Sequence, residues 1–140
     1  MAKFGKTSRA RLETCDGRLQ LLFERIVVKY DCTIVYGHRG KKEQNDAFKL
    51  GKSKLKYPSS KHNSIPSKAI DVSPWVELEN VPGKYGIPWG DLERFRHFSG
   101  YVLGMAHAMG LNIRWGGDWD QDMDYKNNSF NDLVHFELVE

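Results

Sequence analysis

Two short segments of the chain carry side chains that could hold a metal ion. Residues 60–71 contain His62 and Asp71, and residues 132–138 contain His135. Zinc in proteins is bound by His, Cys or carboxylate side chains, and a catalytic zinc keeps one coordination position open for water. We therefore predict that His62, Asp71 and His135 bind one catalytic Zn²⁺ ion.

The strands that carry two of these ligands indicate how the ligands meet. Residues 69–73 and 133–139 are short, largely apolar runs, which is typical of strands. Side chains alternate between the two faces of a strand, so the apolar positions share one face and Asp71 and His135 lie on the other. We expect the apolar face to pack on helices. His62, in the loop before the first of these strands, should fold over the opposite face.

Asp132 lies three residues before His135. In a regular strand this offset would place the two side chains on opposite faces. Asn131 and Asp132 form a turn signal, so we predict that Asp132 lies where the chain enters the strand. From there its carboxylate could act as general base for a water molecule without binding the metal. Glu137, on the same face as His135, could orient that ligand.

The rest of the chain must supply helices that cover the apolar face of the sheet. Apolar residues at spacings of three and four predict two long helices, and Gly17 weakens the first of these patterns. The predicted elements are a helix over 8–30, a strand over 32–36, a helix over 41–50, a long loop over 75–90, a helix over 91–109 and a strand over 111–115. We expect a single α+β domain over residues 1–140. Its small, mostly antiparallel sheet should have helices on one face and the zinc site on the other.

Composition and charge narrow the class of protein. The 140 residues are 40% hydrophobic and 28% charged, the balance of an ordinary globular protein. No apolar run approaches the roughly 20 residues that span a bilayer, and the basic start of the chain lacks the apolar stretch of a secretory signal. The net charge of +3 suits anionic partners such as cell-wall polymers or nucleic acid without choosing between them. Cys15 and Cys32 lie in apolar patterns, which predicts buried thiols.

The ligand segments also have a recognisable form. The chain resembles the zinc peptidases of bacterial cell walls, which include D-alanyl-D-alanine carboxypeptidases, vancomycin-resistance dipeptidases and phage L-alanyl-D-glutamate endopeptidases. Their signature is Ser-x-His, a short loop, Ala-x-Asp, and later a carboxylate two residues removed from a His. The matching residues are Ser60, His62, Ala69, Asp71, Asp132 and His135, together with Gly37, Arg39, Gln44 and the segment 114–119. The offset of nine from His62 to Asp71 is longer than in many members of the family.

The resemblance implies a fold and an activity. The fold would be like that of hedgehog and D-alanyl-D-alanine peptidase domains, and the reaction would be zinc-dependent hydrolysis of a peptide bond in peptidoglycan. Asp132 would take a proton from the attacking water and pass it to the leaving amine, while Arg39 would stabilise the oxyanion or bind a substrate carboxylate. The short length and the Asp base are most similar to the phage endolysin branch, which implies cleavage between L-Ala and D-Glu. Such a protein would be made in the host cytoplasm and act on the wall after release.

The sequence leaves other functions open. The enzyme could instead be a D-alanyl-D-alanine carboxypeptidase or dipeptidase, or the fold could serve as a non-catalytic module that binds the cell wall. The intact set of ligands and base argues against a pure binding module. Lysines at 52, 54, 56 and 61 are compatible with a nucleic-acid binder, but no nucleic-acid motif accompanies them. We expect peptidoglycan as the partner, no nucleic acid, no stable membrane association, and a monomer.

A second group of acidic residues precedes the last strand. Asp118, Asp120, Asp122 and Asp124 alternate with other residues, a spacing similar to that of a calcium-binding loop. Met123 stands where an EF-hand has its glycine, and no glutamate closes the loop. The sequence therefore predicts a looser Ca²⁺ site beside the active centre rather than an EF-hand.

Overall fold

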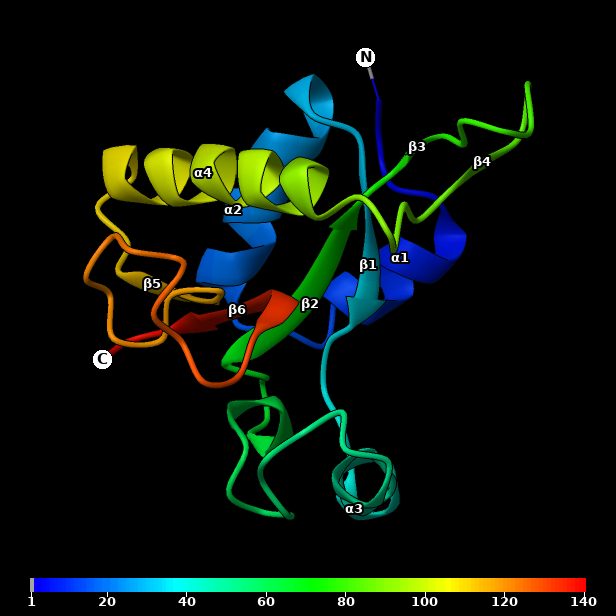
Figure 1. The fold of residues 1–140 in the computed structure, drawn as a ribbon. Coiled ribbons are helices and arrows are strands. Elements are labelled where there is room, and N and C mark those ends of the chain that lie inside the picture. Colours follow the sequence, from blue (N-terminus) through cyan, green and yellow to red (C-terminus); the bar gives the residue numbers. More distant parts are fainter. Residues whose placement is uncertain (1) are drawn as a thin grey trace.

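The structure, a computed structural model, describes residues 2–140. Its centre is an antiparallel sheet of four strands in the order β1-β2-β6-β5 (Figure 1). The strands are β1 (Cys32–Tyr36), β2 (Ala69–Pro74), β5 (Ile113–Gly116) and β6 (Asp132–Leu138). The helices are α1 (Lys6–Leu12), α2 (Gly17–Lys29), α3 (Lys41–Lys49), the 3-10 helix η1 (Lys61–Asn63) and α4 (Leu92–Ala108). The predicted α+β class with a small antiparallel sheet is confirmed.

The core lies between the sheet and the helices α2 and α4. α4 contacts β2, β5 and β6, and α2 packs against α4. Phe136 of β6 is fully buried against Phe23 of α2 and Phe98 of α4, with ring centroids 5.7 and 6.2 Å apart. Ile70 and Val72 of β2 are fully buried in the same core. The apolar positions of β2 and β6 therefore face the helices, as the alternation predicts.

The first predicted helix is wrong in its extent, because residues 8–30 form two helices, α1 and α2. Asp16 caps α2 by accepting a hydrogen bond from the backbone N–H of Arg18 at 2.9 Å. Such a cap satisfies a donor that the helix itself leaves unpaired. Between the helices the backbone pairs with Ser67, which donates to the Thr14 carbonyl and accepts from the Asp16 N–H, both at 2.9 Å. This long-range pairing divides a segment whose apolar periodicity is continuous.

The predicted loop over 75–90 is also incomplete, because it contains a small sheet of two strands, β3 (Val76–Glu77) and β4 (Tyr85–Gly86). Strands of two residues are too short to show a period in the sequence. The helix that follows is confirmed: Asp91 caps α4 by accepting a hydrogen bond from the Arg94 N–H at 3.1 Å. None of the described helices has both the length and the apolar character needed to cross a membrane.

The two cysteines are buried and unbridged, as predicted. Cys15 lies between α1 and α2, and Cys32 begins β1. Burial raises the pKa of the Cys15 thiol to about 11. Because only the thiolate is nucleophilic, these thiols belong to the packing of the core and not to the chemistry of the protein.

Candidate metal centre and active-site cleft

The structure brings His62, Asp71 and His135 together. One ligand atom from each lies within 4.8 Å of the other two, and all three side chains are buried. Nε2 of His62 and Nδ1 of His135 lie 3.0 and 3.3 Å from the same carboxylate oxygen of Asp71. Asp71 and His135 face each other because they are directly paired in the β2–β6 ladder. Two imidazoles and one carboxylate are a donor set that suits zinc.

His62 reaches the centre from η1, in the loop that precedes β2. Ser60 caps η1 by accepting a hydrogen bond from the His62 N–H at 3.2 Å. Nδ1 of the ring donates to the Gly37 carbonyl at 2.7 Å, which leaves Nε2 to face the cluster. The long loop between η1 and β2 is closed by a backbone hydrogen bond from the Lys68 N–H to the Lys61 carbonyl at 3.1 Å. The extra residues of this loop therefore do not separate the ligands.

His135 is held through its other ring nitrogen. Nε2 donates to Oε1 of Glu137 at 2.8 Å, so that Nδ1 faces Asp71. Glu137 in turn accepts a hydrogen bond from Arg114 at 2.7 Å and lies 3.4 Å from Nζ of Lys61. Burial opposes ionisation of Glu137, but the hydrogen bonds from His135 and Arg114 hold its pKa below the usual range. An ionised carboxylate in this position fixes the tautomer and the direction of a histidine ligand.

The electrostatics of the cluster depend on Asp71. Its second oxygen accepts a hydrogen bond from Nη2 of Arg39 at 3.0 Å, and both side chains are buried. Burial opposes ionisation of Asp71, but the charge and hydrogen bonds of His62 and His135 lower its pKa. Burial also opposes protonation of His135, yet hydrogen bonds to Asp71 and Glu137 raise its pKa to about 9. A metal ion must therefore displace a proton from the cluster, and its affinity should rise with pH.

Asp132 is the first residue of β6, where the chain enters the strand, as predicted, although it belongs to the strand and not to a turn. The pairing with β5 is irregular there, because Trp115 pairs with Phe136 whereas Gly116 pairs with Asp132. This bulge interrupts the alternation of side chains, so Asp132 and His135 line the same cleft. A Cβ atom on Gly116 would overlap the backbone of Asp132, so the pairing requires glycine. Burial and the negative charge of the nearby ligand carboxylate raise the pKa of Asp132 to about 6.

The cleft that contains the two histidines, Arg39 and Asp132 has a volume of about 480 Å³. One wall is aromatic: Trp119 lies against His135 with ring centroids 5.3 Å apart and stacks on Phe130 at 6.4 Å. Residues 53–55 and 59–61 line another part of the cleft. Trp119 and Phe130 were not predicted as site residues, although Trp119 ends the segment 114–119 that carries the resemblance. Both lie in an irregular segment, and no sequence period places such a segment relative to the ligands.

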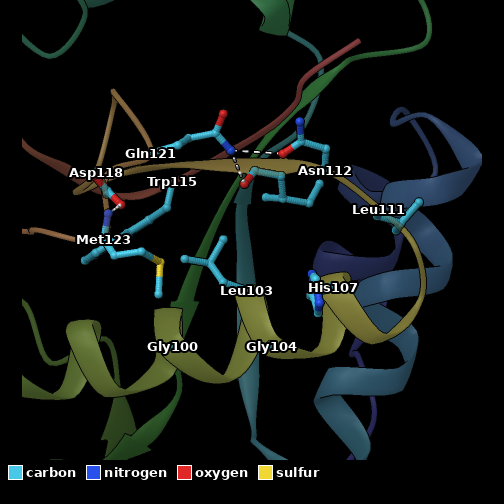
Figure 2. A pocket seen from close by; sticks show the side chains of 11 residues that line it. Gly100, Leu103, Gly104, His107, Leu111, Asn112, Trp115, Asp118, Gln121 and Met123 are labelled. Carbon is cyan, nitrogen blue, oxygen red and sulfur yellow. Dashed lines mark hydrogen bonds between the residues drawn. The ribbon is translucent and has the colours of Figure 1, made fainter.

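A second cavity, of about 570 Å³, lies between α4, β5 and the acidic loop, which comprises residues 118–124 (Figure 2). Leu103 of α4 points into this space toward Trp115 and Met123 (Figure 2). Gln121 closes one side by donating hydrogen bonds to the Asn112 side chain at 2.9 Å and to a backbone carbonyl of β5. The ligands of the metal centre and Asp132 are not in the lining of this cavity. We therefore place the chemistry in the smaller cleft.

The acidic loop gathers three carboxylates. Asp118, Asp120 and Asp122 each bring one oxygen within 4.8 Å of the others, and only Asp118 is buried. Asp118 accepts a hydrogen bond from the Met123 N–H at 2.9 Å, and Asp122 accepts one from the Asp124 N–H at 2.8 Å. These carboxylates thus already bind the backbone of their own loop. The Ca²⁺ site stays a prediction.

The fold and the site together define a class of protein. An antiparallel sheet, covered by helices on one face, presents a buried His-Asp-His cluster and a neighbouring carboxylate of raised pKa in an open cleft. Such a site is suited to hydrolysis. The profile of a family described as phage L-alanyl-D-glutamate peptidase matches residues 1–139. The chain belongs to this family.

One relative supports the family assignment, and one solved structure supports the fold. The L-alanyl-D-glutamate peptidase of Escherichia phage T5 is 36% identical over 144 residues, which cover 98% of this chain and 98% of the phage protein. The crystal structure of the Serratia marcescens L-Ala D-Glu endopeptidase ChiX matches with a TM-score of 0.66 at 20% identity, over 97% of this chain and 89% of that one. At this identity the structural match supports the fold alone. The resemblance to the phage endopeptidase branch of the cell-wall peptidases is confirmed.

Proposed function

We propose that this protein is a zinc-dependent endopeptidase that cleaves the bond between L-Ala and D-Glu in peptidoglycan and acts as a phage endolysin. The proposal rests on one observation: the His62–Asp71–His135 cluster and Asp132 meet at a single cleft. Family membership and the name of the T5 relative support the choice of bond. We also propose that residues 1–140 act as one peptidase domain.

The three ligands fit a zinc ion. Each is oriented from outside the cluster, through the second ring nitrogen of each histidine and the second oxygen of Asp71. His62 would bind through Nε2 and His135 through Nδ1. A zinc ion bound there would lower the pKa of a water ligand from about 15.7 to about 7 and polarise the scissile carbonyl. The ligands supply three of the four positions of a tetrahedral site, as catalytic zinc requires.

Asp132 is the general base of the proposed reaction. With a pKa of about 6 its carboxylate is mostly ionised at neutral pH, yet basic enough to accept a proton from the attacking water. The same carboxyl group then donates that proton to the leaving amine of D-Glu. General base catalysis is most efficient when the pKa of the base lies near the working pH, and burial moves the pKa of Asp132 in that direction.

Arg39 supplies a fixed positive charge in the same cleft. Its guanidinium is bound to Asp71 through one nitrogen and stacks over the Tyr36 ring at 4.5 Å. This double contact holds the group in place before substrate binds. We propose that its remaining donors stabilise the oxyanion that develops on the scissile carbonyl, a contribution of about 10²-fold in kcat for one such donor.

The other readings are weaker. Hydrolysis of D-Ala-D-Ala ends would use the same metal centre, but the family and the T5 relative favour L-Ala-D-Glu. A non-catalytic wall-binding module has no need of the half-buried base Asp132. We propose that the protein works as a monomer, without a nucleic-acid partner or stable membrane association, and reaches the wall after release from the host cytoplasm.

Digestion of purified peptidoglycan tests the proposal. The zinc-loaded protein should release peptides with new N-terminal D-Glu and leave C-terminal L-Ala, as identified by mass spectrometry, and a chelator should abolish the reaction until zinc is restored. New termini at D-Ala would favour the carboxypeptidase. If the protein binds the wall but does not cleave it with zinc present, the protein is a non-catalytic binding module.

A further inference from the structure

The cleft contains a lysine that the proposed mechanism does not use. Three basic residues line it besides Arg39: Lys54, Lys61 and Arg114. Arg114 is hydrogen-bonded to Glu137, and Lys61 lies 3.4 Å from the same carboxylate. Lys54, by contrast, has no carboxylate partner among residues 2–140, and its Nζ lies over the Phe130 ring, 5.1 Å from the centroid. A cation that lines a binding cleft without an internal anion is available to an anionic ligand.

The residues on both sides of Lys54 are held by Gln44. Gln44 of α3 is fully buried, and its Nε2 donates to Oγ of Ser53 at 2.9 Å and to the carbonyl of Leu55 at 2.7 Å. The side-chain oxygen of Gln44 accepts a hydrogen bond from Asn63 at 3.3 Å. Asn63 belongs to η1, the same short helix that carries a metal ligand. A buried polar network therefore fixes the position of Lys54 relative to the metal centre.

The aromatic wall makes the second connection. Lys54 lies over Phe130, Phe130 stacks on Trp119, and Trp119 contacts the ring of His135. The ammonium group therefore stands at the far end of a stack that begins at a metal ligand. A substrate whose scissile bond lies at the metal would extend along this wall toward Lys54.

The chemistry of the proposed substrate supplies the anion. Glutamate has two carboxyl groups, and continuing the peptide uses only one of them. The other is a free carboxylate a few bonds from the nitrogen of the scissile L-Ala-D-Glu bond. A D-Ala-D-Ala end also carries a carboxylate on its leaving residue, but there it ends the peptide, whereas in D-Glu it lies beside a chain that continues.

We propose that Lys54 binds the free carboxylate of the D-Glu residue, and that this contact makes the enzyme selective for the ionised form over the carboxamide. The inference rests on the proposed function, because it assigns a subsite to the same cleft. Lys54 is then a specificity residue and takes no part in bond cleavage. Gln44 acts through it as a positioning residue.

Two substrates and three variants test the subsite. The zinc-loaded protein is assayed with a stem peptide that contains L-Ala-D-Glu with a free carboxylate and with the same peptide as the carboxamide. Wild-type enzyme should favour the carboxylate by about tenfold in kcat/KM, chiefly through KM. Lys54→Gln should lose this preference by weakening only the carboxylate substrate, and Lys54→Arg should restore most of it. Lys56→Gln is the matched control, because Lys56 lies over the Phe48 ring at 5.0 Å and does not line the cleft.

Three results would overturn the subsite. Wild-type enzyme that cleaves both peptides equally, a carboxylate preference that survives in Lys54→Gln, or equal losses in Lys54→Gln and Lys56→Gln would each exclude Lys54 as the selective contact. Failure of the wild type to cleave either peptide with zinc present would remove the proposed function, and the subsite with it. The wild-type control thus separates the two failures.

Discussion

Two clusters in this chain could hold a cation, and they are built differently. His62, Asp71 and His135 are all buried, whereas Asp120 and Asp122 of the acidic loop are exposed. The first cluster joins paired strands and a short helix, so its members come from distant parts of the chain. The second comes from five consecutive residues of one loop. The buried cluster is thus made of residues far apart in the sequence, and the exposed cluster of residues close together in the sequence.

The hydrogen bonds show what this difference means. The ligands of the buried cluster are held by groups outside it, the Gly37 carbonyl, Glu137 and Arg39, and these leave one atom of each ligand facing the centre. The acidic loop instead uses its carboxylates to bind its own backbone N–H groups. Burying an ionised carboxylate is costly unless cations or donors compensate it. The ligand atoms of the buried cluster therefore face one point before any ion binds, whereas the carboxylates of the acidic loop stabilise the loop itself.

Removing a buried ligand should have the largest effect. His62→Ala should lose zinc and about 10³-fold in kcat/KM, because both the polarising ion and its geometry are lost. Asp120→Asn in the acidic loop is the matched control and should keep both. Zinc content by elemental analysis and release of muropeptides measure the two properties. A His62→Ala protein with the zinc content and kcat/KM of the wild type would show that the buried cluster is not the metal centre.

Asp132→Asn should separate metal binding from catalysis. The amide cannot accept a proton, so kcat should fall by about 10²- to 10⁴-fold. Zinc content should stay unchanged, because Asp132 is not among the ligands. Asp122→Asn, which alters an aspartate of the acidic loop, is the control for the loss of one charge. Retained turnover in Asp132→Asn would refute its role as the base.

Glu137→Gln should weaken the buried cluster without removing a ligand. The amide is uncharged and can present its N–H₂ to the histidine, so zinc affinity should fall by about 10- to 100-fold. Competition with a chromogenic chelator measures the change. Glu140→Gln, at an exposed carboxylate paired with Lys68, should leave zinc affinity unchanged. Equal affinities in the two variants would show that Glu137 does not orient His135.

The pH dependence should follow Asp132. Its pKa is raised to about 6, and only the ionised carboxylate accepts a proton, so kcat/KM should fall as pH drops through this pKa, by about tenfold for each further unit. The positive charge of bound zinc can only move this acid limb to lower pH. A profile from pH 8 downward at constant zinc saturation measures it. An acid limb centred well above pH 6 would belong to another group.

The sequence predicts those parts of the site that depend on local periodicity. Asp71 and His135 were placed on one face from the alternation of side chains, and their direct pairing agrees. Asp132 lies at the entry of its strand, as predicted, but the bulge was not predicted, because it depends on Gly116 of another strand. The break between α1 and α2 was missed because it depends on Ser67. Long-range pairings of this kind leave no period in the sequence.

The same limit applies to the walls of the cleft. Lys54, Trp119 and Phe130 lie in irregular segments, and only the tertiary fold brings Lys54 to the two aromatic rings. From the sequence, Lys54 is only one of four lysines compatible with nucleic-acid binding. Its place in the cleft is set by Gln44, whose side chain is fully buried in the polar network. The family pattern named Gln44, but a pattern does not state what a residue holds in position.

Addition of calcium should have the smallest effect on stability and activity, yet it tests most directly how the acidic loop differs from the buried cluster. If the acidic loop binds Ca²⁺ at tenfold above its dissociation constant, the linked stabilisation is about 1.4 kcal/mol, or roughly 5 °C in Tm. Burial raises the pKa of Asp118, so the shift should diminish as the pH falls toward that pKa and protons compete for the carboxylates. Asp122→Asn should abolish the shift while zinc content is unchanged. If calcium changes neither the Tm nor the activity, the acidic loop is stabilised by its own hydrogen bonds and binds no Ca²⁺. The buried cluster is then the one cation site among the described residues.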